Sequence, residues 1–218
     1  MGEPRLGDRT RARVERARMG TRRRLGLDRS GPPPPETLAG HPLNPWTIPN
    51  AIGFVRLALI PAFLILDMSS RDGQDALPAA LFAFGAGGDY LDGIVARLTG
   101  QYSRLGALLD PVVDRLLVLS GVAVCWRFDL LPRWALAVLI AREVAVVALA
   151  RIGLRRGQDL KINWPGRLAV WPTMSAIVFA LIGLLTLAEV LLYVGLALGL
   201  AALAMYARDG VSALRAAR

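Results

Sequence analysis

The stretch from Asp89 to Asp114 reads DYLDGIVARLTGQYSRLGALLDPVVD, and it places four aspartates within or at the ends of two otherwise apolar segments. An unpaired charge in the middle of a membrane helix costs roughly 3 kcal/mol, so something must compensate these carboxylates. Asp89 and Asp92 are three residues apart, and Asp110 and Asp114 are four apart, so each pair shares one helix face. Two adjacent antiparallel helices then present all four carboxylates to one cavity.

Four like charges in a low-dielectric cavity repel one another unless cations lie between them. The chain has one histidine, His41, and one cysteine, Cys125, so oxygen atoms must hold any metal. Hard oxygen ligands of this kind favour Mg²⁺ or Mn²⁺. The pattern therefore predicts a cluster of two divalent cations on Asp89, Asp92, Asp110 and Asp114.

The composition indicates a membrane protein. The chain has 218 residues, of which 54% are hydrophobic, and its mean hydropathy is +0.44. The net charge of +9 comes mainly from arginines in short blocks beside apolar segments. This arrangement suits an anionic membrane surface better than nucleic acid, so no nucleic-acid partner is expected.

Hydropathy predicts an all-α fold with six transmembrane helices, each near the length that a bilayer requires. The predicted spans are roughly 48–68, 76–98, 108–127, 132–152, 168–188 and 190–207, with the last turn near Glu189. The arginine-rich connections and both ends fall on one side, so the positive-inside rule predicts cytoplasmic termini and a multi-pass protein of the plasma membrane.

The chain divides into a basic N-terminal arm, residues 1–45, and a six-helix domain, residues 46–218. Residues 1–30 carry ten arginines against four acidic residues. A basic surface helix over residues 9–27 is one alternative for the arm, and disorder up to the membrane is the favoured one.

Small residues and one arginine lie between the two aspartate pairs. Gly93, Ala96 and Gly106 remove side-chain bulk on or beside the carboxylate faces, where a phosphorylated ligand can approach the backbone. Arg97 can bind a phosphate with two hydrogen bonds. The alternative explanation is that the small residues let helices pack closely and that Arg97 marks the cytoplasmic edge of its span.

These residues spell Asp89-x₂-Asp92-Gly93-x₂-Ala96-Arg97-x₈-Gly106-x₃-Asp110-x₃-Asp114, a pattern that resembles the signature of the CDP-alcohol phosphotransferase family at every fixed position. Eight fixed residues over 26 positions make the match specific. The resemblance covers about residues 46–207. It implies a six-helix fold whose active site opens to the cytoplasmic half of the bilayer, and it also implies a homodimer.

The resemblance assigns roles to individual residues. Three aspartates, Asp89, Asp92 and Asp110, chiefly hold the two metals, and Asp114 is the general base. The CDP part of CDP-diacylglycerol is expected to contact a further set of matching positions: Ile48, Pro49, Asn50, Ala51, Arg56, Gly93, Ala96, Arg97, Ser103 and Gly106. The implied reaction transfers the phosphatidyl group to an alcohol and releases CMP.

The acceptor alcohol is predicted from weaker similarities. Arg142-Glu143 and Gly166-Arg167 resemble stretches of the phosphatidylglycerophosphate synthases, which favours glycerol 3-phosphate, although Arg167 stands where a lysine is usual and Ala169 where a second lysine is usual. The candidate acceptor-binding residues are the basic group Arg142, Arg151, Arg155, Lys161 and Arg167. The positive-inside rule explains most of this basic group equally well.

Three alternatives stay open. A cardiolipin synthase of the same family would use phosphatidylglycerol as the acceptor. An intramembrane cation transporter would explain the carboxylates but not the fixed glycines and Arg97. A non-enzymatic scaffold anchored by the arginine arm would not need the aspartates at all.

Overall fold

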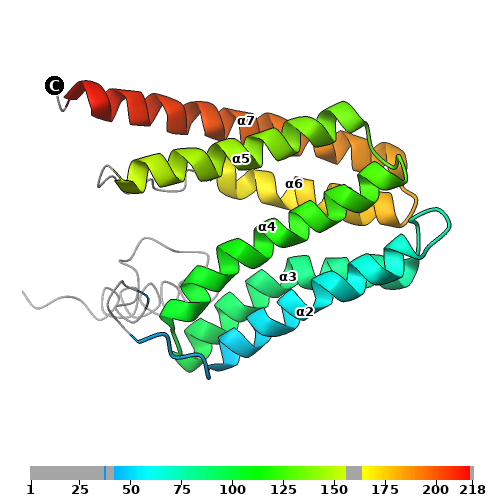
Figure 1. Cartoon of the computed structure of the whole chain (residues 1–218), viewed down its shortest axis with the longest axis horizontal. Coiled ribbons are helices and arrows are strands. Elements are labelled where there is room, and N and C mark those ends of the chain that lie inside the picture. The colour runs from blue at the N-terminus through cyan, green and yellow to red at the C-terminus, as the bar shows by residue number, and fades with distance from the viewer. Residues whose placement is uncertain (1–36, 38–41, 156–163, 217–218) are drawn as a thin grey trace, which may run out of the picture. The chain divides into compact units, whose positions relative to one another are not determined.

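The computed structural model describes Thr37, residues 42–155 and residues 164–216. Within this described part the chain forms six α-helices and no strand, which confirms the all-α prediction. The predicted basic arm falls almost entirely outside the described residues. The helices of Figure 1 are α2 (Ile48–Met68), α3 (Ala76–Thr99), α4 (Arg104–Arg127), α5 (Arg133–Arg155), α6 (Trp164–Leu181) and α7 (Leu185–Ala216).

The break between α6 and α7 differs from the prediction, which put the last turn near Glu189. The chain turns at Gly183, whose φ of 81° is in the left-handed region that glycine adopts without strain. The amide of Leu184 donates to the carbonyl of Phe179 at 2.9 Å, which closes α6 with a glycine-dependent cap. Glu189 lies inside α7, where its carboxylate accepts a hydrogen bond from Tyr193 one turn later. The apolar run across residues 181–187 concealed this break, because hydropathy does not register a single glycine turn.

The chain divides into two compact units. The first unit is the described part of Met1–Leu57 together with Gly87–Val113, and the second is Ala58–Ala86 together with Asp114–Arg218. The first unit therefore holds the start of α2, the last half of α3 and the start of α4. The second unit holds the remainder of these helices and all of α5, α6 and α7.

The second unit is built by apolar packing. Phe63 of α2 and Phe82 of α3 are both fully buried, and their ring centroids are 5.2 Å apart. A Cβ atom at Gly121 of α4 would lie 2.6 Å from Ile177 of α6 and 2.7 Å from Phe82 of α3. The glycine therefore lets α4 pack closely against these two side chains. Figure 1 shows α5, α6 and α7 alongside one another, and α7 packs against both of the others.

Two helical segments, Ile48–Met68 and Leu185–Arg208, are long and apolar enough to cross a membrane. A shorter apolar segment, Leu168–Leu181, lies in α6. Many large apolar side chains of the described residues are exposed, including Ile65 at 68% and Val144 at 64%. Exposed apolar surface of this extent is expected of a protein that packs against lipid.

Candidate active site

A pocket of about 190 Å³ lies in the first unit, where the starts of α2 and α4 meet the last turns of α3. It brings together nine of the residues that the sequence predicts for the site: Pro49, Asn50, Asp92, Gly93, Ala96, Arg97, Ser103, Gly106 and Asp110. These residues come from positions up to 61 apart in the chain, so the helix starts and the 100–103 turn must fold correctly to gather them. The pocket is therefore the candidate active site.

Two of the predicted metal ligands, Asp92 and Asp110, line this pocket. Asp92 is only 6% exposed, and both Asp110 and Asp89 act on its carboxylate electrostatically. Asp89 is exposed on α3, one turn before Asp92. The first unit thus concentrates negative charge around Asp92, which is the condition that a bound cation relieves.

Arg56 of α2 supplies positive charge at the same carboxylate. Its Nη1 lies 3.2 Å from Oδ2 of Asp92, and the two side chains are 1% and 7% exposed. The aliphatic part of Arg56 crosses α3 at Gly88, where a Cβ atom would lie 2.6 Å from Cδ of Arg56. Gly88 therefore forms a notch that lets the arginine reach Asp92, a role that the sequence motif does not indicate.

A second polar network fixes the edge of the pocket. The Ser103 hydroxyl donates to Oδ1 of Asn50 at 2.8 Å and accepts from the amide of Gly106 at 2.9 Å. The side-chain amide of Asn50 donates to the carbonyls of Asn44 and Pro45. A Cβ atom at Gly106 would lie 2.7 Å from Oδ1 of Asn50. Gly106 is thus required for the contact between the starts of α2 and α4, and Asn50 and Ser103 hold the pocket wall in place.

Gly93 and Arg97 are one turn apart on α3. A Cβ atom at Gly93 would lie 3.3 Å from Nη1 of Arg97, so the guanidinium folds back over the glycine. Both residues line the pocket. This position directs a planar cation with several donors toward the space beside Asp92, where it can bind a phosphate.

Asp114 lies on α4, one turn after Asp110, and is half-buried. It belongs to the second unit, whereas Asp89, Asp92 and Asp110 belong to the first. Within residues 42–155 and 164–216, no three histidine, cysteine or acidic side chains are grouped closely enough to hold a metal ion. The donor set of carboxylate oxygens nevertheless fits a hard divalent cation, with Asp92 and Asp110 as the pair that shares a pocket.

The other residues predicted to bind the CDP part lie around the pocket without lining it. Ile48 is 53% exposed at the start of α2, and its backbone amide donates to Oε1 of Gln101 at 3.0 Å. Ala51 is exposed. Arg56 contacts Asp92, which lines the pocket.

Of the predicted acceptor-binding residues, only Arg142 and Arg151 have described side chains, and they line different cavities. Arg142 is ion-paired with its neighbour Glu143 and lines a cavity of about 30 Å³ that also contains Thr173 and Gly199. That volume holds a water molecule rather than a glycerol phosphate. Arg151 is exposed on α5 and lines a different cavity. The side chains of Arg155 and Arg167, and the whole of Lys161, lie outside the described residues.

The pocket also contains residues that the sequence analysis missed, namely Thr37, Gln101, Tyr102 and Ala107. Gln101 and Tyr102 occupy the variable spacer immediately before Ser103, and Gln101 also binds the start of α2. The sequence could have indicated these residues, because the family pattern fixes the number of residues between Arg97 and Gly106 even though their types vary. A fixed length implies a turn of defined shape. Thr37 falls in the arm, where no sequence pattern indicates a site.

Comparison with known proteins identifies the family of this chain. The family model of the CDP-alcohol phosphatidyltransferases matches residues 46–201, which include all four aspartates. The match confirms the family and the enzyme class that the aspartate motif predicts. It begins just before α2 and excludes the N-terminal arm.

Individual relatives carry two different names. A CDP-diacylglycerol--glycerol-3-phosphate 3-phosphatidyltransferase of Bacillus subtilis is 32% identical over 61% of this chain and 75% of the relative. Another enzyme of that name, from Pectobacterium atrosepticum, is 34% identical over 63% of this chain and 77% of the relative. A cardiolipin synthase (CMP-forming) of Streptomyces coelicolor is 39% identical over 60% of this chain and 62% of the relative. This chain belongs to the CDP-alcohol phosphatidyltransferase family.

Proposed function

We propose that the protein transfers a phosphatidyl group from CDP-diacylglycerol to glycerol 3-phosphate and releases CMP. The observation that carries the proposal is the pocket of the first unit, in which Asp92, Asp110 and Arg97 share one lining with Gly93 and Gly106. A diphosphate needs cationic donors and close approach to the backbone, and this lining supplies both.

Two divalent cations, Mg²⁺ or Mn²⁺, would be held by Asp89, Asp92, Asp110 and Asp114, and they would supply charge neutralisation of the diphosphate. Arg56 holds the Asp92 carboxylate in position. Arg97 binds the diphosphate from the side of Gly93. Asn50 and Ser103 keep the wall of the CDP pocket in place.

In the transfer step, the acceptor hydroxyl oxygen attacks the phosphorus attached to the diacylglycerol. A new oxygen–phosphorus bond forms as the bond from that phosphorus to the bridging oxygen breaks, and CMP leaves with the bridging oxygen. Asp114 takes the proton of the attacking hydroxyl. No covalent intermediate on the protein is required for this balance.

Glycerol 3-phosphate is favoured as the acceptor by the Arg142-Glu143 and Gly166-Arg167 stretches and by the names of the Bacillus and Pectobacterium relatives. Phosphatidylglycerol is the second candidate, because the Streptomyces cardiolipin synthase is 39% identical. The purified protein is incubated with labelled CDP-diacylglycerol, a divalent cation and each acceptor separately. We expect phosphatidylglycerophosphate and CMP with glycerol 3-phosphate. Cardiolipin from phosphatidylglycerol, with no product from glycerol 3-phosphate, would reverse the choice.

We also propose that the six helices α2 to α7 each cross the plasma membrane, with both termini in the cytoplasm. The arginine asymmetry of the connections supports this arrangement. After Cys125→Ala removes the native thiol, Ser70→Cys and Ser212→Cys should react with an impermeant reagent from opposite sides. The same sidedness for both variants would refute the six-span arrangement.

A further inference from the structure

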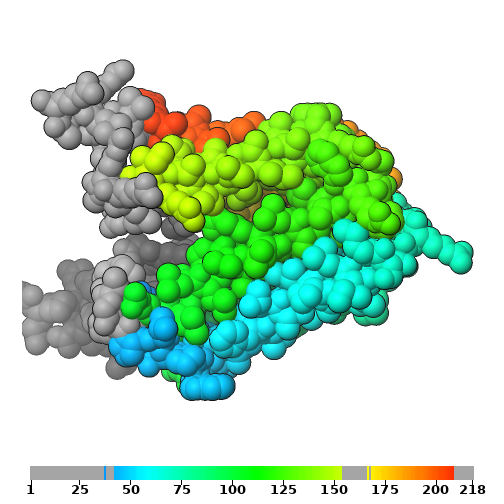
Figure 2. Space-filling view, in the orientation of Figure 1, coloured from blue at the N-terminus to red at the C-terminus, as the bar shows by residue number. Residues whose placement is uncertain are grey.

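A groove of about 490 Å³ lies in the second unit between α4 and α5. Its volume is within the range of about 300–1,000 Å³ that is usual for small-molecule sites. Figure 2 shows the surface hollowed between these two helices. The lining residues are mostly aliphatic, and three are charged, namely Arg115, Glu143 and Arg151.

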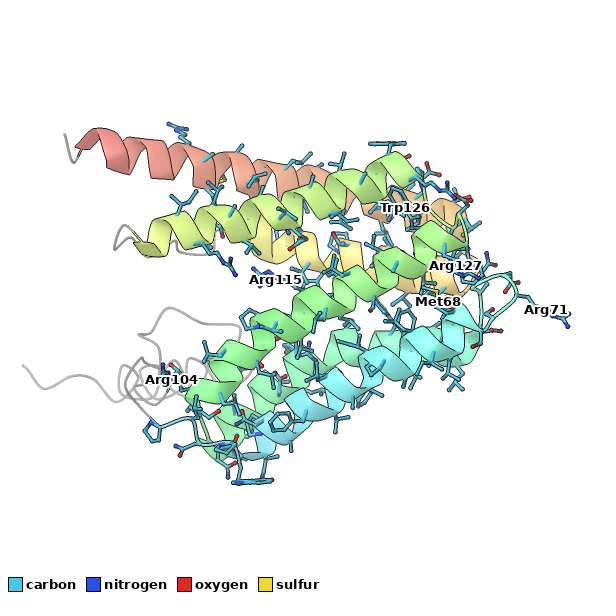
Figure 3. The ribbon with its side chains drawn as sticks, viewed as in Figure 1. Met68, Arg71, Arg104, Arg115, Trp126 and Arg127 are labelled. Carbon is cyan, nitrogen blue, oxygen red and sulfur yellow. The ribbon has the colours of Figure 1, made fainter. Side chains whose placement is uncertain are left out.

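Each of the two helices contributes one arginine to the lining, Arg115 from the middle of α4 and Arg151 from the last turns of α5. Figure 3 shows Arg115 on the side of α4 that faces α5. The carboxylate of Glu143 is already paired with Arg142. With two arginines against one carboxylate, the charged residues of the lining sum to a net positive charge.

Apart from its three charged residues the groove is apolar. One turn beyond Arg115 on α4 lies Leu119, and α5 contributes aliphatic side chains that include Ile140, Val144 and Val147. The stripe from Ile140 to Ile152 covers 13 residues, or about 18 Å of helix. A long, mostly apolar wall that also carries two guanidinium groups matches a molecule with a hydrocarbon chain and an anionic head.

The groove lies on a different side of α4 from the predicted catalytic carboxylates. Successive helix residues are about 100° apart, so Arg115 points well away from both Asp110 and Asp114. None of the aspartates of the motif lines the groove. Because the groove and the candidate active site share no lining residue, the ligand of the groove need not be a reactant.

We propose that this groove binds an anionic phospholipid, with its phosphate at Arg115 and Arg151 and one acyl chain along Leu119, Val144 and Val147. A guanidinium pair binds a phosphate diester with charge-assisted hydrogen bonds that a zwitterionic lipid weakens through its own cation. Anionic lipids are also enriched at the cytoplasmic leaflet, which the proposed orientation places at the end of α5 that holds Arg151. The inference does not depend on the transfer reaction.

The test uses the purified full-length protein in detergent with EDTA and without CDP-diacylglycerol. Dioleoylphosphatidylserine is the probe because it is neither the donor nor either candidate acceptor, and dioleoylphosphatidylcholine is the reference lipid. Native mass spectrometry measures how much of each lipid the protein retains. The double variant Arg115→Gln/Arg151→Gln is compared with Arg71→Gln/Arg127→Gln, which loses the same charge from two exposed arginines outside the groove.

We expect the wild type and the Arg71/Arg127 variant to retain more phosphatidylserine than phosphatidylcholine. In the groove variant the ratio of the two retained lipids should fall about tenfold. If the double variant fails to fold, the single change Arg151→Gln is measured, since this arginine is exposed on α5. Equal losses in both double variants would show that the lipid preference depends on the net charge of the protein and not on the groove, and would overturn the proposal.

Two further measurements address other occupants. Displacement of the lipid by millimolar glycerol 3-phosphate or inorganic phosphate would make the groove a soluble-phosphate site and contradict the proposal. Val144→Cys in the Cys125→Ala background places a thiol on the groove wall, where Val144 is 64% exposed. Disulfide-linked dimers that form with loss of retained lipid would show that a second copy covers the groove instead.

Discussion

The buried polar side chains of the two units make different kinds of contact. In the first unit these side chains join separate helices: Arg56 of α2 reaches Asp92 of α3, and Ser103, just before α4, donates to Asn50 of α2. In the second unit Ser120 and Thr173 are also buried, but each hydroxyl donates to a carbonyl of its own helix at 2.7 Å.

The two kinds of hydrogen bond have different structural consequences. A hydroxyl that bonds within its own helix can sit in an apolar core at little cost and holds nothing else in place. A polar pair between helices requires both helices to be correctly placed, and breaking it leaves a buried group without its partner. Asp67 of the second unit fits neither description, because no hydrogen-bond partner for its carboxylate is found among the described residues.

The largest effect is expected of Asp114→Asn, at the point of α4 where the second unit begins. Loss of a general base lowers turnover by about 10²–10⁴-fold, and affinity for CDP-diacylglycerol should change little. Asp110→Asn should instead raise the cation concentration needed for half-maximal activity, because this residue lines the pocket with Asp92. The measurement is CMP release across a Mg²⁺ or Mn²⁺ titration. Asp129→Asn, at an exposed carboxylate paired with Arg133, is the control, and near-normal turnover in Asp114→Asn would remove the base assignment.

The second prediction compares two neighbouring glycines of α3. Gly88→Ala would place a methyl group 2.6 Å from Cδ of the buried Arg56, whereas at Gly87 an added Cβ meets nothing within 4 Å. Overpacking of this kind costs about 1–3 kcal/mol, and displacement of Arg56 disturbs Asp92. We expect Gly88→Ala to lower turnover by about tenfold, the effect of losing about 1.4 kcal/mol of transition-state stabilisation.

Gly87→Ala should retain normal turnover and unfold at the same temperature or slightly higher, since alanine favours helix by up to about 1 kcal/mol over glycine. Direct binding of Mn²⁺, followed by its paramagnetic resonance signal, adds a readout that does not depend on turnover. Equal behaviour of the two alanine variants would show that Arg56 does not need the notch at Gly88.

The third prediction asks whether acceptor recognition belongs to the second unit. Arg167→Ala should raise the KM for glycerol 3-phosphate several-fold, on the order of 1 kcal/mol for one charge-assisted contact, and leave the KM for CDP-diacylglycerol unchanged. Steady-state kinetics with each substrate varied in turn give both values. A rise in the KM for CDP-diacylglycerol alone would mean that Arg167 recognises the donor, which would contradict the prediction.

Much of the site was predictable because its motif is local in sequence. Helical spacing predicted that Asp92, Gly93 and Arg97 lie near one another, and the family pattern added Asn50 and Ser103. The structure brings all five to the lining of one pocket. Contacts between distant residues were not predictable from spacing. Gly88 acquires a role only when Arg56 crosses it, 32 positions away in the chain.

The fold shows the same limit. The predicted span 48–68 coincides with α2, whereas the predicted turn near Glu189 was wrong because the chain turns at Gly183. Hydropathy averages over a window and so locates apolar segments well, but a cap depends on one backbone conformation. The ion pair of Arg142 with Glu143 was likewise hidden, since a sequence motif does not reveal which side chain neutralises a charge.

The fourth prediction concerns close packing in the second unit and should have the smallest effect on catalysis. A Cβ atom at Gly195 of α7 would lie 2.4 Å from Oγ1 of Thr173 and 3.1 Å from its backbone nitrogen. The backbone of α6 cannot rotate away as a side chain can, so Gly195→Ala should destabilise the protein by about 1–3 kcal/mol. Thermal unfolding in detergent measures this loss, and turnover per folded molecule should stay within about twofold, well under the effect of 1 kcal/mol on a rate. Ala197→Gly on the same helix removes rather than adds a methyl group, and it controls for helix propensity alone. A fall in turnover as large as that of Gly88→Ala, without a change in unfolding temperature, would mean that the second unit contributes to catalysis through this contact and would weaken the distinction between the two units.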